Sequence, residues 1–196
     1  MVISWWFVSG GIPNNELTTS VQYPNQFAPY LHFLSSLDVD SYIEIGCRFG
    51  GTFLLTVEYL SRFRTLGTAV AVDIAPSPVE YACLSDRLTC EFVLADSSTD
   101  EFRRYLGDTN FTLAFIDGDH SYEGVRRDYL LMRERAKVLV FHDVASSSVP
   151  GVGRLWREVK SEGDFEIHEF IQQYPDVRAR GGGRFFGIGV AVRLEV

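Results

Sequence analysis

Five short apolar runs in this chain are each followed at once by an acid or a glycine turn, and helical patterns separate them. Such alternation is typical of a parallel sheet with helices packed on both faces. The carboxyl ends of parallel strands meet at one edge, where open α/β sheets bind their ligands. A single site is therefore predicted at the five run ends, which are Glu44 to Gly46, Asp73, Asp96, Asp117 and Asp143.

The periodicity predicts an α/β fold with a Rossmann-like, seven-stranded, mostly parallel sheet. The expected strands are 41–46, 68–74, 90–95, 113–116, 137–141, 165–171 and 185–192. The expected helices are an apolar stripe at Phe27, Tyr30, Leu31 and Leu34 after a proline loop at 21–29, then 52–63, 79–88, 100–106, 122–136 and 152–160. A long loop without a clear helix joins the last two strands, so we expect the last strand to be antiparallel.

Composition limits the classes of partner. The 196 residues are 46% hydrophobic, enough for one domain, 1–196, with an arm and helix at 1–40 before a core at 41–196. The net charge of −8 disfavours a nucleic-acid partner, because an acidic protein repels phosphate. No apolar run approaches the length of a membrane span, and the short apolar start lacks the basic flank of a signal peptide.

Three cysteines, Cys47, Cys83 and Cys90, lack a C-x-x-C spacing. Their odd number argues against a disulfide framework and a cysteine-type zinc site, and it favours a cytoplasmic location. The apolar segment from Ile3 to Val8 should find a surface to cover. Two interpretations stay open: an edge strand or arm on its own domain, or a homodimer contact or a cover over the site.

The first strand runs into the turn E-I-G-C-R-F-G-G. A glycine turn of this kind lets the backbone approach a ligand closely. Arg48 stands where the dinucleotide fingerprint requires its middle glycine, which counts against a nucleotide-dependent oxidoreductase.

Together, EIGCRFGGT, AVDI, LADSS, FIDGDHSYEG and VFHDV resemble the successive motifs of class I S-adenosylmethionine-dependent methyltransferases, from Ser41 to Lys160. The last two resemble the small metal-dependent sugar and macrolide O-methyltransferases and their cephalosporin-hydroxylase-like relatives. The resemblance implies that Asp73 binds the ribose hydroxyls and that Ile74 packs on the adenine. It further implies cofactor contacts from Glu44, Gly46, Cys47, Gly50, Asp96, Ser97 and Asp117.

Methyl transfer to a hydroxyl requires positioning and loss of a proton. His120 follows the fourth strand end and is the predicted general base or acceptor contact, with Asp117 as its catalytic neighbour. Alternatively, a divalent metal lowers the pKa of the hydroxyl. The resemblance implies metal ligands at Asp117 and Asp143, and His142 replaces an acid, so the site would accept manganese, iron or zinc as readily as magnesium.

The sequence thus predicts an S-adenosylmethionine-dependent O-methyltransferase for a small sugar-like or natural-product-like hydroxyl compound, with Mg²⁺ or Mn²⁺ as the candidate metal. The main alternative is a cofactor-binding protein of the same fold without activity. An RNA ribose methyltransferase with a Lys-Asp-Lys-Glu tetrad is disfavoured, because Lys137 and Lys160 are the only lysines. Ser121 is the expected N-cap of the helix after His120.

Overall fold

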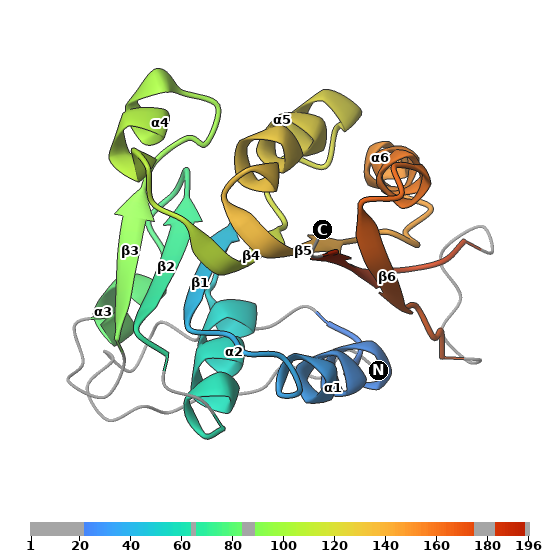
Figure 1. Cartoon of the computed structure of the whole chain (residues 1–196), viewed down its shortest axis with the longest axis horizontal. Helices are drawn as coiled ribbons and strands as arrows, with labels where there is room; N and C mark the ends of the chain where they lie inside the picture. The colour runs from blue at the N-terminus through green and yellow to red at the C-terminus, as the bar shows by residue number, and fades with distance from the viewer. Residues whose placement is uncertain (1–21, 64–65, 84–88, 175–182, 195–196) are drawn as a thin grey trace.

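The structure, a computed structural model, describes residues 22–63, 66–83, 89–174 and 183–194. Within these ranges, seven strands form one sheet in the order β3-β2-β1-β4-β5-β7-β6 (Figure 1). The strands are β1 (Ser41–Ile45), β2 (Thr68–Asp73), β3 (Cys90–Leu94), β4 (Phe111–Ile116), β5 (Ala136–His142), β6 (Phe165–Phe170) and β7 (Ile188–Arg193). The helices are α1 (Pro24–Leu34), α2 (Gly51–Ser61), α3 (Val79–Cys83), α4 (Asp100–Leu106), α5 (Tyr122–Arg133) and α6 (Pro150–Ser161).

Strand pairing confirms the predicted fold class. Strand β1 pairs in parallel with β2 and β4, and the parallel pairing continues to β3 and β5. Strand β7 runs antiparallel between β5 and β6. The chain winds outward from β1 in both directions, so the crevice between the ends of β1 and β4 is the topological switch point, where this class of sheet binds ligands.

Helices cover both faces of the sheet (Figure 1). Helices α4, α5 and α6 pack on one face, where Phe102, Val125 and Trp156 join a buried apolar cluster. On the opposite face, α1 and α2 contribute Tyr30 and Phe53 to a second cluster. Strand β4 is buried at every position, because it lies at the centre of the sheet between these two layers.

Several element ends differ from the sequence-based prediction. Helix α1 begins at Pro24, inside the expected loop, because proline is well suited to a first helical turn. Pro29 lies inside α1, and the burial of Phe27 and Tyr30 offsets its missing N–H donor. Helix α5 ends at Arg133, so Ala136 opens β5 and does not share the helix face. Pro150 likewise starts α6 two residues before the expected helix at 152–160.

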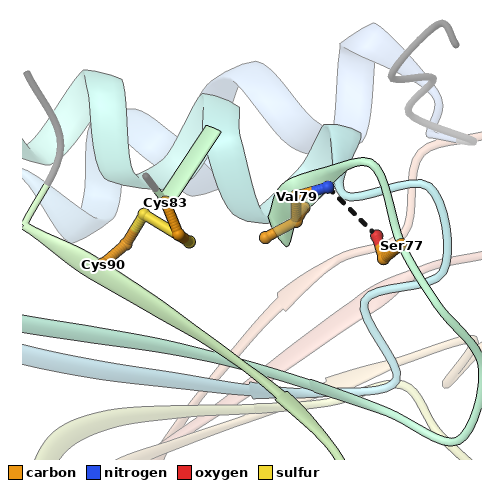
Figure 2. Close-up of a disulfide and its surroundings, with 4 residues drawn as sticks. All are labelled: Ser77, Val79, Cys83 and Cys90. Carbon is orange, nitrogen blue, oxygen red and sulfur yellow. Dashed lines mark hydrogen bonds between the residues drawn. A yellow bond between two sulfur atoms is a disulfide. The ribbon is translucent and has the colours of Figure 1, made fainter. Parts of the chain in front are cut away.

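Cys83 and Cys90 form a disulfide, which the odd number of cysteines did not predict (Figure 2). The pairing arises because α3 ends at Cys83 and the chain returns at the start of β3, which places the two Cα atoms 4.9 Å apart. Cys47 remains free and buried. The bridge joins neighbouring elements and is not a framework for the fold.

The amino-terminal segment from Ile3 to Val8 lies outside the described residues, as do positions 84–88 of the third expected helix and the glycines at 181–182. Both interpretations of the amino-terminal segment therefore stay predictions. Among the described helices, none is long and apolar enough to cross a membrane.

Candidate functional site

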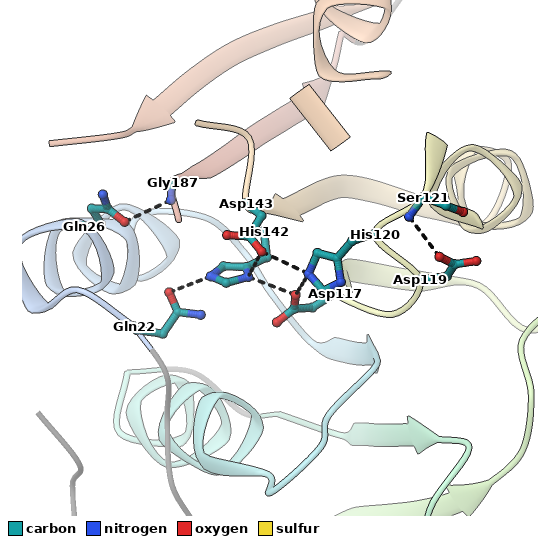
Figure 3. A network of polar contacts seen from close by, with 9 residues as sticks. All are labelled: Gln22, Gln26, Asp117, Asp119, His120, Ser121, His142, Asp143 and Gly187. Atoms are coloured by element: carbon teal, nitrogen blue, oxygen red, sulfur yellow. Dashed lines mark hydrogen bonds and ion pairs between the residues drawn. The ribbon is translucent and has the colours of Figure 1, made fainter. Parts of the chain in front are cut away.

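Four polar side chains converge at the carboxyl ends of β4 and β5 (Figure 3). Asp117 follows β4, and its Oδ1 lies 2.9 Å from His142 Nδ1 and 3.2 Å from His120 Nε2. Asp143 Oδ2 lies 3.0 Å from the same His120 nitrogen. One donor atom from each of the four side chains lies within 4.8 Å of the others. We call Asp117, His120, His142 and Asp143 the His–Asp cluster.

The His–Asp cluster concentrates charge in a partly buried place. The hydrogen bonds to Asp117 and Asp143 raise the pKa of His120 to about 10. Burial lowers the pKa of His142, but the charge and hydrogen bond of Asp117 and the charge of Asp143 together outweigh burial, and the net shift is upward. Burial likewise raises the pKa of Asp117, but the two imidazoles outweigh it and hold that pKa below its ordinary value. The two carboxylates therefore require positive charge between them, from protonated imidazoles or from a metal ion.

The start of α5 and the packing of α6 fix the position of His120 within the His–Asp cluster. Ser121 is the N-cap of α5, as predicted, since its side-chain oxygen accepts a hydrogen bond from the Gly124 N–H. Asp119 turns away from the cluster and accepts a hydrogen bond from the Ser121 N–H (Figure 3). The start of α6 packs on this turn, and a Cβ on Gly151 would lie 2.8 Å from the His120 carbonyl oxygen.

A pocket of about 160 Å³ opens beside the His–Asp cluster. The end of β1 and the turn after it line the pocket with three predicted cofactor residues: Glu44, Gly46 and Cys47. Gly46 has φ +89°, and a Cβ there would lie 2.3 Å from the Asp117 carbonyl oxygen, so only glycine lets the ends of β1 and β4 meet. Burial raises the pKa of Glu44 to about 8, although the Tyr42 hydroxyl donates a hydrogen bond to its carboxylate.

Backbone strain is concentrated at this pocket. Among the described residues, the non-glycine positions with positive φ are Arg48, Asp143 and Phe186, and all three line the pocket. Each such conformation costs about 1–3 kcal/mol and persists only where the surroundings impose it. Strain of this kind is typical of ligand sites. At Asp143 the turn follows β5 directly and aims the carboxylate at His120.

A second group of predicted residues lies at the carboxyl end of β2 and just before the start of α2. Asp73 Oδ2 accepts a hydrogen bond of 2.7 Å from the Arg48 N–H, and its Oδ1 accepts one of 3.0 Å from the Ala75 N–H. Ile74 next to it is 76% exposed. A Cβ on Gly50 would lie 1.7 Å from a Val79 methyl carbon, so this glycine permits close packing between α2 and α3.

The end of β3 carries Asp96 and Ser97, which are not among the residues that line the pocket. Asp96 accepts a hydrogen bond from the Ser98 N–H. The Ser97 hydroxyl donates to Asp128 on α5, at 2.7 Å. Asp128 is fully buried, and its second oxygen has no hydrogen-bond partner.

Sequence reasoning missed four residues of the pocket: Gln22, Arg48 as a lining residue, Thr52 and Phe186. Thr52 lies one position past the glycine turn, so its place could have been inferred from the start of α2. Gln22 and Phe186 come from opposite ends of the chain, and no motif marks them. His120 belongs to the cluster of potential metal ligands, whereas the sequence predicted only Asp117, His142 and Asp143.

Several solved structures with a similar fold are described as methyltransferases. The O-methyltransferase TomG from Streptomyces achromogenes, in complex with SAM, shares 17% identity at a TM-score of 0.61, over 90% of this chain and 82% of TomG. Cofactor-bound Rv0187 from MTB shares 17% identity at a TM-score of 0.65, over 94% of this chain and 84% of Rv0187. An O-methyltransferase from Bacillus cereus in complex with SAH shares 18% identity at a TM-score of 0.59, over 93% of this chain and 84% of the Bacillus cereus protein. These similarities place the chain in the methyltransferase fold.

A family described as a methyltransferase domain matches residues 43–144, more than half of the 196-residue chain. The chain therefore belongs to this methyltransferase family. The prediction of a class I S-adenosylmethionine-dependent methyltransferase is confirmed. No curated protein sequence matches the chain.

Proposed function

We propose that this methyltransferase transfers the methyl group of S-adenosylmethionine to a hydroxyl of a small molecule, with a divalent metal ion at the His–Asp cluster. The observation that carries the proposal is the convergence of two carboxylates and two imidazoles within 4.8 Å, beside the pocket at the end of β1. The similar TomG and Bacillus cereus proteins are O-methyltransferases, which favours a hydroxyl acceptor.

The carboxyl edge of the sheet offers a surface that fits S-adenosylmethionine. Two backbone N–H groups hold the Asp73 carboxylate, and its remaining lone pairs can accept hydrogen bonds from the ribose hydroxyls. Ile74 offers an uncovered apolar side chain for the adenine. Glu44, Gly46 and Cys47, at the end of β1 and in the turn after it, line the pocket that we assign to the methionine part. When bound, the cofactor supplies an electrophilic methyl group.

The donor set of the His–Asp cluster suits a divalent ion. We assign Asp117, His142 and Asp143 as its ligands, because His142 is 6% and the two carboxylates 18% and 13% exposed in their side chains. His120, at 34%, is the most exposed of the four and faces the acceptor. Mixed oxygen and nitrogen donors favour Mn²⁺, Fe²⁺ or Zn²⁺ over Mg²⁺. A bound ion would lower the pKa of the acceptor hydroxyl.

Calorimetric titration with S-adenosylmethionine and S-adenosylhomocysteine tests the cofactor part of the proposal. We expect both to bind. Absence of binding for both would contradict the whole proposal.

The metal is tested by turnover on a panel of small hydroxyl compounds, before and after treatment with EDTA. We expect EDTA to abolish S-adenosylhomocysteine formation and Mn²⁺ to restore it, while calorimetry shows unchanged cofactor binding. Full turnover after EDTA treatment would contradict the metal part of the proposal. The cytoplasmic location, the absence of nucleic-acid partners, the homodimer and the single domain at 1–196 stay predictions.

A further inference from the structure

Gln22 lies just before α1 and reaches the far side of the His142 ring (Figure 3). Its Oε1 is 3.1 Å from His142 Nε2, and both residues are 5% exposed. The opposite ring nitrogen, Nδ1, lies 2.9 Å from Asp117 Oδ1. The imidazole is therefore held from two sides, by a neutral amide at one nitrogen and by the carboxylates of the His–Asp cluster at the other.

The chemistry of the contact determines which atom carries the proton. An amide oxygen can only accept a hydrogen bond, so the His142 Nε2–H must donate to Gln22. A metal ion in the His–Asp cluster could bind only Nδ1, because Nε2 carries a proton and donates it in the hydrogen bond to Gln22. A second partner of this kind orients a ligating histidine and increases its basicity.

Neighbouring aromatic rings fix the plane of the imidazole. They do not distinguish the two orientations that share this plane and differ by a half-turn about the Cβ–Cγ bond. The His142 ring lies 6.3 Å from the Phe115 ring and 5.6 Å from the Phe186 ring, with interplanar angles of 28° and 30°. A half-turn of the imidazole would remain compatible with these rings. It would move Nδ1 away from Asp117 and break the bond to Gln22, so the amide distinguishes the two orientations.

We propose that Gln22 is a positioning residue, which keeps the proton on His142 Nε2 and presents Nδ1 to the metal held with Asp117 and Asp143. The inference rests on the metal assignment of the proposed function. It adds to that assignment the ligating atom and a residue from an otherwise unmarked segment.

Nitrogen NMR of the ¹⁵N-histidine-labelled protein tests the proton position directly. We expect a protonated His142 Nε2 both with and without Zn²⁺, and a shift of Nδ1 alone when Zn²⁺ is added. In Gln22→Leu the Nε2 proton should exchange faster with water, because its acceptor is gone. An unprotonated Nε2 in the wild-type protein, or Zn²⁺ binding through Nε2, would overturn the inference.

Zn²⁺ affinity, measured by competition with a chromogenic chelator, separates positioning from packing. We expect Gln22→Leu to weaken binding about 10–100-fold, and Gln22→Glu, which keeps an acceptor oxygen, to stay within about threefold. A packing role predicts the reverse order, since leucine is apolar and glutamate would bury a charge. The reverse order, or equal affinities, would contradict the inference.

Gln26→Leu is the matched control. Gln26 is a buried glutamine in α1, where its amide bonds the Gly187 N–H and the Gln172 carbonyl and does not contact His142. We expect lower stability and unchanged Zn²⁺ affinity. Equal weakening in Gln22→Leu and Gln26→Leu would assign the effect to general loosening of α1. If the wild-type protein bound no metal, the metal part of the proposed function would fail, while the Nε2 proton signal and its response to Gln22→Leu would still decide the inference.

Discussion

Two parts of the carboxyl edge of the sheet, one at β4 and β5 and the other at β2, are built in different ways. At the ends of β4 and β5, side chains bind one another across strands, and the His–Asp cluster joins residues from two strand ends. At the end of β2, Asp73 is held by two backbone N–H groups, that of Arg48 in the turn after β1 and that of Ala75 in its own turn, and Ile74 is 76% exposed. We call these the chemistry end and the cofactor end.

The difference follows from what each end must bind. A cofactor with a sugar and a base needs an open surface with fixed acceptors, and backbone turns hold the Asp73 carboxylate in place there. Activation of a hydroxyl needs several groups at short, fixed distances, which only packed neighbouring strands supply. Changes at the chemistry end should therefore affect the rate, and changes at the cofactor end should affect affinity.

The largest effect is expected for His120→Ala. It should lower kcat for S-adenosylhomocysteine formation by roughly 10²–10⁴-fold, because His120 would accept the proton of the acceptor hydroxyl once a metal ion supplies the positive charge between the two carboxylates. Cofactor affinity by calorimetry should change little, since His120 lies at the chemistry end. His168→Ala is the control, because His168 on β6 lies away from the cluster. Equal loss of rate and cofactor affinity would contradict the separation of the two ends.

Gly46→Ala should damage both ends together. The substitution forces a positive φ on alanine and places Cβ 2.3 Å from the Asp117 carbonyl oxygen. We expect a loss of about 2–5 kcal/mol in the free energy of unfolding, measured by urea denaturation. Gly67→Ala is the control, since its nearest neighbour to an added Cβ lies at 3.5 Å and its φ is not positive. Wild-type stability in Gly46→Ala would mean that the β1 and β4 ends can separate.

Asp128 supplies the one side-chain bond from α5 to Ser97 near the cofactor end. Burial raises its pKa to about 6, above the ordinary value of 3.8, while the Ser97 bond and Arg127 lower it and Asp119 and Asp96 raise it. The native state therefore prefers the protonated acid. Its contribution to stability is complete below about pH 4 and is lost as the pH rises through about 6.

Replacement by asparagine should remove this loss. Relative to the wild-type protein, Asp128→Asn should gain up to about 3 kcal/mol in unfolding free energy between pH 4 and pH 8. Urea denaturation across that range measures the difference, with the exposed Asp108→Asn as a control. Parallel pH profiles for Asp128→Asn and the wild-type protein would show that the carboxyl does not titrate as inferred.

The smallest effect is expected for Asp73→Asn. Loss of the charged acceptor should weaken S-adenosylmethionine binding by about 10–100-fold, and kcat at saturating cofactor should stay close to the wild-type value. Calorimetry and turnover measure the two quantities, and the exposed Asp38→Asn is the control. A fall in kcat without a fall in affinity would place Asp73 at the chemistry end.

Local sequence patterns predicted most of the architecture. The apolar runs predicted where the strands lie along the sequence. The absence of a crossover helix between the last two strands predicted that β7 is antiparallel. Errors fell where tertiary packing outweighed local signals, as at Pro29, which stays within α1 because its neighbours are buried. The Cys83–Cys90 bond was missed because its geometry depends on where α3 ends.

For the candidate site, the sequence determined which acids and histidines follow the strands, since residues at strand ends share one edge. Only the tertiary structure brought His120 into the same cluster as Asp117, His142 and Asp143, because the strand ends and the α6 packing fix its position. The tertiary structure also decided the contact of Gln22 with His142, across 120 positions of chain. A contact between distant segments depends on how the whole sheet and its helices pack, and no local pattern records it.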